Sequence, residues 1–71
     1  MLDGKYANYF QIGENALEFV IEFGQAYADE PEQIHTRIIT SPVYAVQLLT
    51  LLRDALQQYE EQFGPIQRRQ P

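Results

Sequence analysis

Few side chains in this sequence could support catalysis or metal binding. His35 is the only histidine, and the chain contains no cysteine. A histidine that activates a nucleophile needs a serine or cysteine within hydrogen-bond reach and a third group that orients its ring, and no spacing in the sequence assembles that set around His35. A single histidine without cysteine also excludes an ordinary structural zinc site. We therefore predict no catalytic residue, no metal site and no cofactor, and we expect that the chain is not an enzyme.

The other residues considered for chemistry are two groups of carboxylates, which could bind a cation. Glu18 and Glu22 would share one face of a strand, but no third carboxylate or glycine-rich loop frames them as a cation site. The favoured interpretation is an ion pair with Arg37. The acidic stretch from Asp29 to Glu32 lacks the ligand spacing of a calcium loop, so we predict a solvated turn there.

The elements that would position these residues begin with a β-hairpin. Aromatic and β-branched residues are dense in Tyr6–Ile12 and Leu17–Gly24, and Gly13–Ala16 supplies the residues of a tight connection. A four-residue loop there would place Phe10 opposite Phe19. Because side chains alternate along a strand, the phenylalanines would share one face of the hairpin, and the other face would be mixed.

A third strand is predicted over Ile34–Thr40, after an exposed turn around Pro31. On this strand Ile38 would join the phenylalanine face. His35 and Arg37 would lie on the opposite, mixed face beside the two glutamates, where opposite charges attract across neighbouring strands.

The junction of Ser41 and Pro42 predicts the start of a long helix. A residue before proline is pushed into extended dihedrals, so Ser41 can end the strand and offer its hydroxyl as the helix N-cap. Proline suits the first helical position, where its missing N–H is not needed. No further Gly or Pro appears before Gly64 and Pro65, which gives a helix of about 21 residues.

The apolar side of this helix is wider than its own sheet can cover. At about 100° per residue it occupies an arc of roughly 160°, whereas an ordinary surface helix has a stripe of about 100°. Its members are Tyr44, Ala45, Leu48, Leu49, Leu51, Leu52, Ala55, Leu56, Tyr59 and Phe63, and Val46 widens it further. The centre of the arc around Leu52 would face the sheet, and one edge would remain for a second body.

Chain length gives an independent reason to expect self-association. A chain of 71 residues buries only roughly 60% of its extended surface on folding, and this one has neither a disulfide nor a zinc site to compensate. We therefore predict a homo-oligomer, a dimer or a dimer of dimers, and another protein is a further candidate partner. The candidate interface on the helix is Val46, Leu49, Arg53 and Leu56. The alternative interface on the mixed sheet face is Tyr9, Val20 and Ile39. A monomer with half-exposed leucines stays a competing interpretation.

Composition narrows the class of partner. With 10 acidic and 5 basic residues the formal net charge is -5, which repels nucleic acid and anionic membrane surfaces. No run of 18 apolar residues and no signal-peptide pattern is present. We expect a cytoplasmic protein with one domain over residues 1–66 and a flexible tail over residues 67–71.

Several short motifs resemble a known family when they are taken together. They are Tyr6-Ala7-Asn8, Glu18-Phe19, Phe23-Gly24, the run Arg37-Ile38-Ile39-Thr40-Ser41-Pro42, Tyr59-Glu60 and Phe63-Gly64. In this combination the chain resembles the small bacterial and archaeal family known as domain of unknown function 3467. The resemblance implies the same architecture and no assigned activity, so it transfers no catalytic residues.

The sequence therefore predicts an α+β fold, in which a three-stranded antiparallel β-meander is followed by one long C-terminal helix packed on one face of the sheet. Two classes of function remain open. The first is a non-catalytic oligomeric module with a structural or protein-interaction role. The alternative is a holdase similar to a reduced version of the protein-export chaperone SecB, which would bind unfolded polypeptide in apolar grooves.

Overall fold

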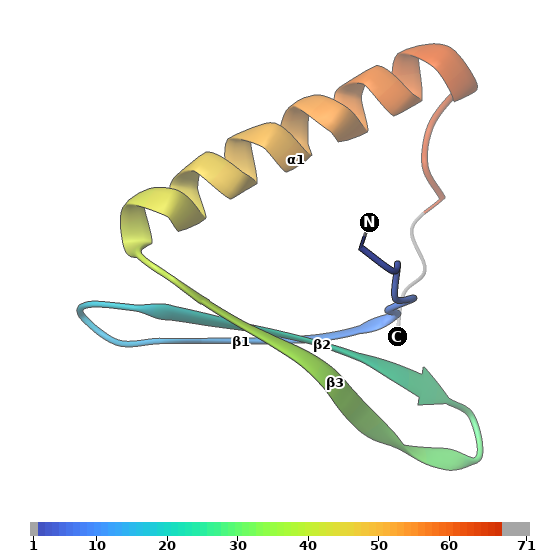
Figure 1. Cartoon of the computed structure of the whole chain (residues 1–71). Helices are drawn as coiled ribbons and strands as arrows, with labels where there is room; N and C mark the ends of the chain where they lie inside the picture. The colour runs from blue at the N-terminus through green and yellow to red at the C-terminus, as the bar shows by residue number, and fades with distance from the viewer. Residues whose placement is uncertain (1, 68–71) are drawn as a thin grey trace.

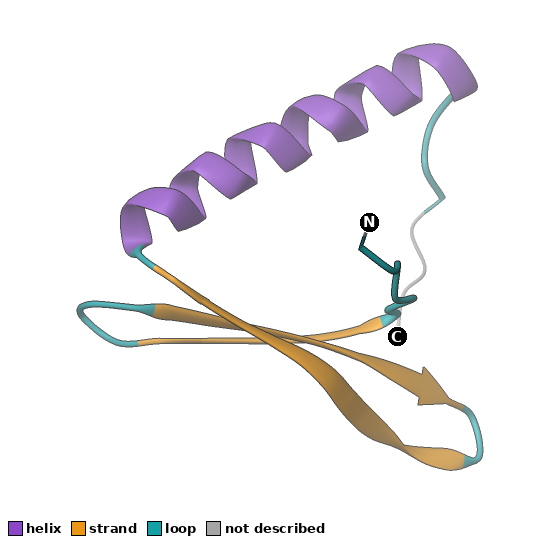
Figure 2. Cartoon of the chain, in the orientation of Figure 1, coloured by secondary structure: helices purple, strands orange, loops and turns teal. Residues whose placement is uncertain are grey.

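The computed structural model of the chain describes residues 2–67. Its elements follow the order βββα. They are β1 (Tyr9–Glu14), β2 (Phe19–Tyr27), β3 (Glu30–Thr40) and α1 (Pro42–Phe63). The strands form one antiparallel sheet in the order β1-β2-β3, and the helix follows it (Figures 1 and 2). The predicted meander and C-terminal helix are confirmed. Of the predicted tail, residues 68–71 lie outside the described part of the chain.

The first hairpin has the predicted faces but a different register. Phe10 pairs with Phe23, and Ile12 pairs with Ile21, whereas the sequence placed Phe10 opposite Phe19. The rings of Phe10 and Phe23 meet edge to face, with centroids 5.8 Å apart. The register therefore differs by four residues, an even number, and each side chain keeps its predicted side of the sheet.

The loop of this hairpin explains the difference, because it lies two residues later than predicted. The side-chain oxygen of Asn15 accepts hydrogen bonds from the backbone N–H groups of Leu17 (2.8 Å) and Glu18 (2.9 Å). The N–H of Asn15 donates to the carbonyl of Glu18 at 2.9 Å. An asparagine side chain that satisfies the turn's own backbone makes Asn15–Glu18 the favoured connection.

The second hairpin is longer than predicted. β2 continues to Tyr27, and β3 begins at Glu30, so only Ala28 and Asp29 connect them. The predicted turn around Pro31 is wrong, because Pro31 lies inside β3. It is tolerated there because β3 is an edge strand, where a missing N–H need not remove a ladder bond.

A β-bulge at Gly24 reverses the predicted direction of His35. Phe23 pairs with Thr36 but Gly24 pairs with Ile34, so His35 is an extra residue in β3. Gly24 is the only buried residue in the described chain. A Cβ there would overlap the carbonyl oxygen of Gln33, so glycine is required by the close approach of β3.

The predicted helix caps are confirmed. Ser41 is extended (ψ 162°), and its hydroxyl oxygen accepts a hydrogen bond from the N–H of Tyr44 at 3.3 Å. Pro42 is the first helical residue. At the other end Gly64 has φ 90°, a conformation that glycine adopts at little cost, and its N–H donates to the carbonyl of Glu60 at 2.9 Å.

The predicted packing of the helix on its own sheet is wrong in this chain. α1 lies above the sheet (Figure 1), yet no helical side chain is buried, and Leu52, expected at the centre of the core, is 54% exposed. The physical reason is the shape of the sheet. A narrow, three-stranded sheet twists strongly and offers little surface to a straight helix of about 33 Å.

Candidate functional site

The predicted ion pair on the mixed sheet face is formed. Glu22 and Arg37 lie opposite each other on β2 and β3. One carboxylate oxygen of Glu22 is 2.6 Å from Nη2 of Arg37 and accepts a hydrogen bond from its Nε at 2.7 Å. The arginine side chain is 65% exposed and the glutamate 18%. Glu18 lies in the hairpin loop instead, and within residues 2–67 no three potential metal ligands gather.

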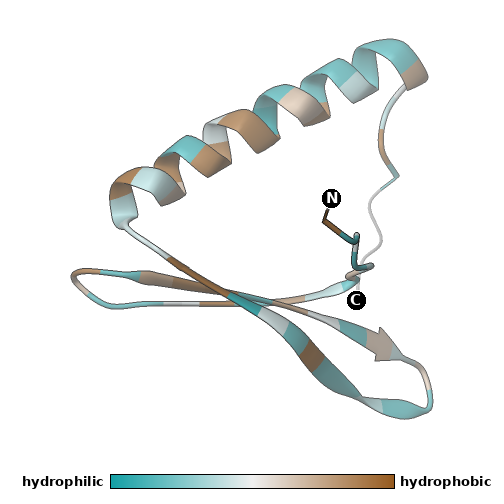
Figure 3. Ribbon diagram, in the orientation of Figure 1, coloured by the Kyte–Doolittle hydropathy of each residue, from teal (hydrophilic) through white to brown (hydrophobic). Residues whose placement is uncertain are grey.

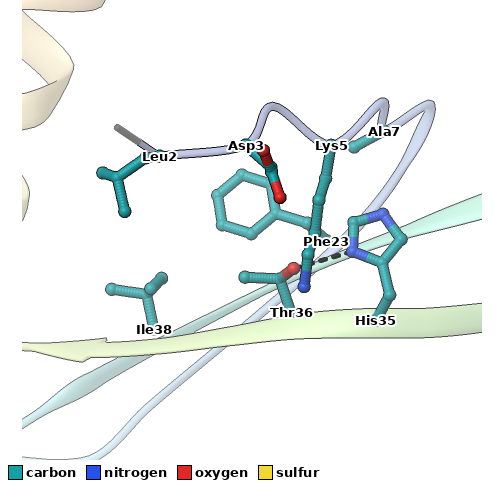
Figure 4. Close-up of a pocket in the computed structure, with 8 residues that line it drawn as sticks. All are labelled: Leu2, Asp3, Lys5, Ala7, Phe23, His35, Thr36 and Ile38. Carbon is teal, nitrogen blue, oxygen red and sulfur yellow. Dashed lines mark hydrogen bonds between the residues drawn. The ribbon is translucent and has the colours of Figure 1, made fainter.

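His35 belongs to a contact that the sequence did not predict. Its ring lies on the face of Phe23 and Thr36, where residues 2–7 cross the sheet (Figure 4). Nε2 is 2.9 Å from the carbonyl oxygen of Tyr6, and Nδ1 is 2.7 Å from the hydroxyl of Thr36. A carbonyl can only accept, so Nε2 carries the proton, and in the neutral ring Nδ1 accepts from Thr36. The predicted position of His35 beside the glutamates is therefore wrong.

A second set of hydrogen bonds holds the same N-terminal segment. The side chain of Asn8 donates to the carbonyl of Ala26 at 3.1 Å and accepts from the Ala26 N–H at 2.8 Å. The N–H of Asn8 donates to the carbonyl of Gly24 at 3.0 Å. The side chain of Gln25 also donates to the carbonyl of Tyr6 at 3.2 Å. An asparagine side chain thus extends the ladder between β1 and β2 beyond its last regular pair.

The N-terminal segment and the sheet enclose an open pocket of about 490 Å³. Its lining residues are Leu2, Asp3, Lys5, Ala7, Phe23, His35, Thr36 and Ile38 (Figure 4). Both ring nitrogens of His35 already have partners in the protein. The walls are otherwise mostly apolar, and the hydroxyl that lies beside His35 is that of Thr36, which donates to Nδ1. This pocket is therefore a mostly apolar gap between the N-terminal segment and the sheet.

The apolar side of α1 is open to solvent along its length. The predicted interface residues Val46, Leu49, Arg53 and Leu56 are all exposed. Two shallow grooves run along the helix. The first is lined by Leu49, Leu52, Arg53, Leu56, Gln57 and Glu60, and the second by Leu52, Ala55, Leu56, Tyr59 and Ile66. The apolar residues are densest in the first half and middle of the helix (Figure 3).

In the observed register, the three residues of the alternative sheet interface do not all lie together. Val20 pairs with Ile39, so these two side chains are neighbours. Tyr9 pairs with Gly24, four residues further along β2, at a distance of roughly 13 Å. The three residues therefore do not form the single cluster that the predicted register required.

The total surface shows how much of the chain is left uncovered. The accessible area is 6842 Å². A folded monomer of 8.3 kDa is expected to expose about 4,600 Å², so this chain has an excess of about 2,200 Å². No hydrophobic side chain among residues 2–67 is buried. The three strands and the helix are formed, but the described residues contain no hydrophobic core.

These features define a small βββα protein whose helix and sheet leave their apolar side chains exposed. The chain belongs to the family described as Protein of unknown function (DUF3467), which matches residues 1–68. Neither the curated proteins nor the solved structures contain a significant match. Among the described residues, no helix is both long enough and apolar enough to cross a bilayer.

Proposed function

We propose that this chain is a non-catalytic structural module that works as a homo-oligomer, a dimer or a dimer of dimers, and that offers its assembled surface to other proteins. The observation that carries the proposal is the missing core. The helix is well capped and the sheet is well paired, yet no side chain of α1 is buried. Apolar surface on this scale is unfavourable in water by about 25 cal/mol per Å², so it is stable only when covered.

The excess surface has the size of a homo-oligomer interface. Obligate interfaces bury about 2,000–5,000 Å² in total, which is about 1,000–2,500 Å² from each partner. The excess of about 2,200 Å² per chain falls within that range. A second copy supplies the same apolar arc and therefore a surface of matching chemistry.

Charge opposes this association, so apolar burial must drive it. Each chain carries a formal net charge of -5, and two copies therefore repel each other at low ionic strength. Added salt screens this repulsion over a Debye length of about 8 Å at 0.15 M. Association should therefore tighten when salt is raised, whereas an interface based on ion pairs would weaken.

Sedimentation equilibrium at micromolar concentration tests the proposal. The unmodified chain should be a dimer or tetramer. Leu52→Asp should lower the mass or unfold the chain, because a charge would be buried at the interface. The matched control is Gln47→Asp, which adds the same charge about 140° away around the helix at a residue that lines neither groove. In an isolated chain Leu52 is already 54% exposed, so a monomer would tolerate both substitutions equally.

Thermal unfolding gives a second readout. If two chains of 71 residues unfold together, with about 0.7 kcal/mol of enthalpy per residue, tenfold dilution lowers the midpoint by about 5 °C. A monomeric unmodified chain with a midpoint independent of concentration would overturn the proposal.

One observation favours the holdase as a second candidate. Ile39 is 57% exposed next to Val20, on the mixed face of the sheet rather than the phenylalanine face. An assembly that leaves this face open could bind apolar segments of unfolded polypeptide, which is the activity expected of a holdase similar to SecB. The test is whether the purified oligomer suppresses aggregation of a chemically unfolded protein at stoichiometric amounts. Ile39→Lys should abolish that suppression and leave the oligomer mass unchanged; normal suppression by Ile39→Lys would reject this surface.

A further inference from the structure

The two edges of the sheet differ in their protection against pairing with another strand. On the β3 edge, Pro31 and its two acidic neighbours lie within the strand, and both register irregularities add a residue to β3. Prolines, charges and bulges are the features by which natural edge strands avoid intermolecular pairing. The β3 edge is therefore guarded.

The β1 edge has neither a proline nor a bulge and carries a single charge. Its six residues pair with β2 in an uninterrupted register, without proline, and Glu14 is their only charge. Phe10 and Ile12 are 57% and 64% exposed. The segment before β1 turns away from this edge, because the carbonyl of Tyr6 is held by Gln25 and His35 on the neighbouring strands.

The hydrogen-bond pattern shows which backbone groups β1 offers. Asn15 and Glu18 form a hydrogen-bonded pair at the end of the hairpin. Such pairs alternate along an antiparallel ladder, so Gln11 and Gly13 direct their N–H and C=O groups toward β2. The backbone groups of Phe10 and Ile12 are directed to the free edge.

We propose that β1 pairs antiparallel with β1 of a second copy, about a two-fold axis at Gln11. This inference rests on the proposed homo-oligomer and specifies its contact. In this register Phe10 of each copy lies opposite Ile12 of the other as a hydrogen-bonded pair, and an aromatic residue facing a β-branched one is a favourable cross-strand pair. On the other face Gly13 lies opposite Tyr9 of the second copy, whose ring can cover the missing side chain.

The pairing joins two sheets into one of six strands and removes the unguarded edge of each copy. The two-fold axis is perpendicular to such a sheet, so the phenylalanine faces of both copies lie on the same side. α1 lies on this side in each chain, above the N-terminal segment (Figures 1 and 4). Both apolar helices are thus brought to one side of a sheet twice as wide.

Disulfide trapping tests the contact directly, because the chain has no native cysteine. In a non-hydrogen-bonded antiparallel pair the two Cα atoms are about 4.5 Å apart, which is within the range of about 4.4–6.8 Å for a disulfide. Under mild oxidation most of Gln11→Cys should become a covalent dimer. The control Gln33→Cys places a thiol at another exposed position, on the guarded β3 edge, and should remain mainly reduced.

Hydrogen exchange gives a second measurement that needs no cysteine. In an isolated chain only the inward amides of Gln11 and Gly13 would be protected in the middle of β1. In the proposed pair those of Phe10 and Ile12 should be protected as well. Ile12→Pro removes an outward N–H without breaking the ladder to β2, so it should reduce the association, whereas Ile12→Val should retain it.

The outcomes separate the two proposals. A monomeric unmodified chain would remove the basis of both. An oligomeric unmodified chain in which Gln11→Cys cross-links no faster than Gln33→Cys, and in which the Phe10 and Ile12 amides exchange freely, would overturn the β1 contact and leave the homo-oligomer standing.

Discussion

Gly24 offers a direct test of the sheet that positions these surfaces, because it is the point where β3 approaches β2 most closely. In Gly24→Ala the new Cβ would overlap the carbonyl oxygen of Gln33 and would lie 2.9 Å from its carbonyl carbon and 3.0 Å from Cα of Ile34. These are backbone atoms of β3, which cannot rotate away as the end of a side chain could. The bulge that turns His35 toward the N-terminal segment must therefore shift.

The expected cost is that of overpacking a closely packed site, about 1–3 kcal/mol. For a domain of this size each kcal/mol lowers the unfolding midpoint by roughly 4–8 °C. Gly13→Ala is the matched control, since Gly13 also lies within a strand but its Cβ would meet nothing within 4 Å. Alanine there should be neutral or should stabilise the strand by up to about 1 kcal/mol.

The measurement is urea or thermal unfolding followed by circular dichroism, with all variants at one protein concentration because association would otherwise change the midpoint. In Gly24→Ala the NMR cross-peaks of the His35 ring should also move. Equal stability of the two alanine variants would show that β3 does not approach Gly24 as described, and the bulge would then lose its support.

Two further substitutions test the N-terminal segment and the helix start. Asn8→Ala removes both side-chain hydrogen bonds to Ala26 and should lower the free energy of unfolding by about 1–2 kcal/mol. The loss in Asn8→Asp should be smaller, because aspartate keeps the acceptor; urea midpoints equal to that of the unmodified chain would contradict this role. Ser41→Ala removes the N-cap acceptor for Tyr44 and should cost about 1 kcal/mol, whereas Ser41→Thr should be nearly neutral. Unchanged stability of Ser41→Ala would mean that the hydroxyl does not cap the helix.

The helix was predictable because its ends depend on neighbouring residues. Ser41 and Pro42 constrain each other's backbone, and Gly64 ends the helix with a positive φ. The faces of the strands were predictable for a similar reason, since alternation of side chains requires only the local sequence. The ion pair of Glu22 and Arg37 followed from that alternation.

The register and the position of His35 were not predictable from alternation alone. A shift by an even number of residues leaves every face unchanged, so the pattern could not distinguish a loop at Gly13 from one at Asn15. The bulge at Gly24 then placed the side chain of His35 on the opposite face of the sheet from the one predicted. A glycine inside a strand pattern is a known signal of a bulge or close approach, and it could have been applied to Gly24. No comparable signal pointed to the bonds between Asn8 and Ala26.

The unexpected exposure of α1 and the proposed pairing of β1 with a second copy bear on the same question, namely which contact completes the core. A β1 pair engages only one edge of six residues in each chain, chiefly backbone groups and the flanks of Phe10 and Ile12. It cannot by itself cover an excess of about 2,200 Å² per chain. No side chain of α1 is buried, so we expect the helices to contribute a second contact.

Where that second contact lies decides between a dimer and a dimer of dimers. If the two helices on one side of the six-stranded sheet cover each other, then the helix and strand contacts belong to the same dimer, and Leu52→Asp should weaken both. If the helices instead meet those of another six-stranded sheet, then Leu52→Asp should reduce a tetramer to a dimer and leave the Gln11→Cys cross-link intact. The apolar arc of roughly 160°, which the chain's own sheet leaves exposed, is wide enough to meet more than one neighbouring element of an assembly. The mass of Leu52→Asp, measured with and without the cross-link, therefore identifies the surface that completes the core.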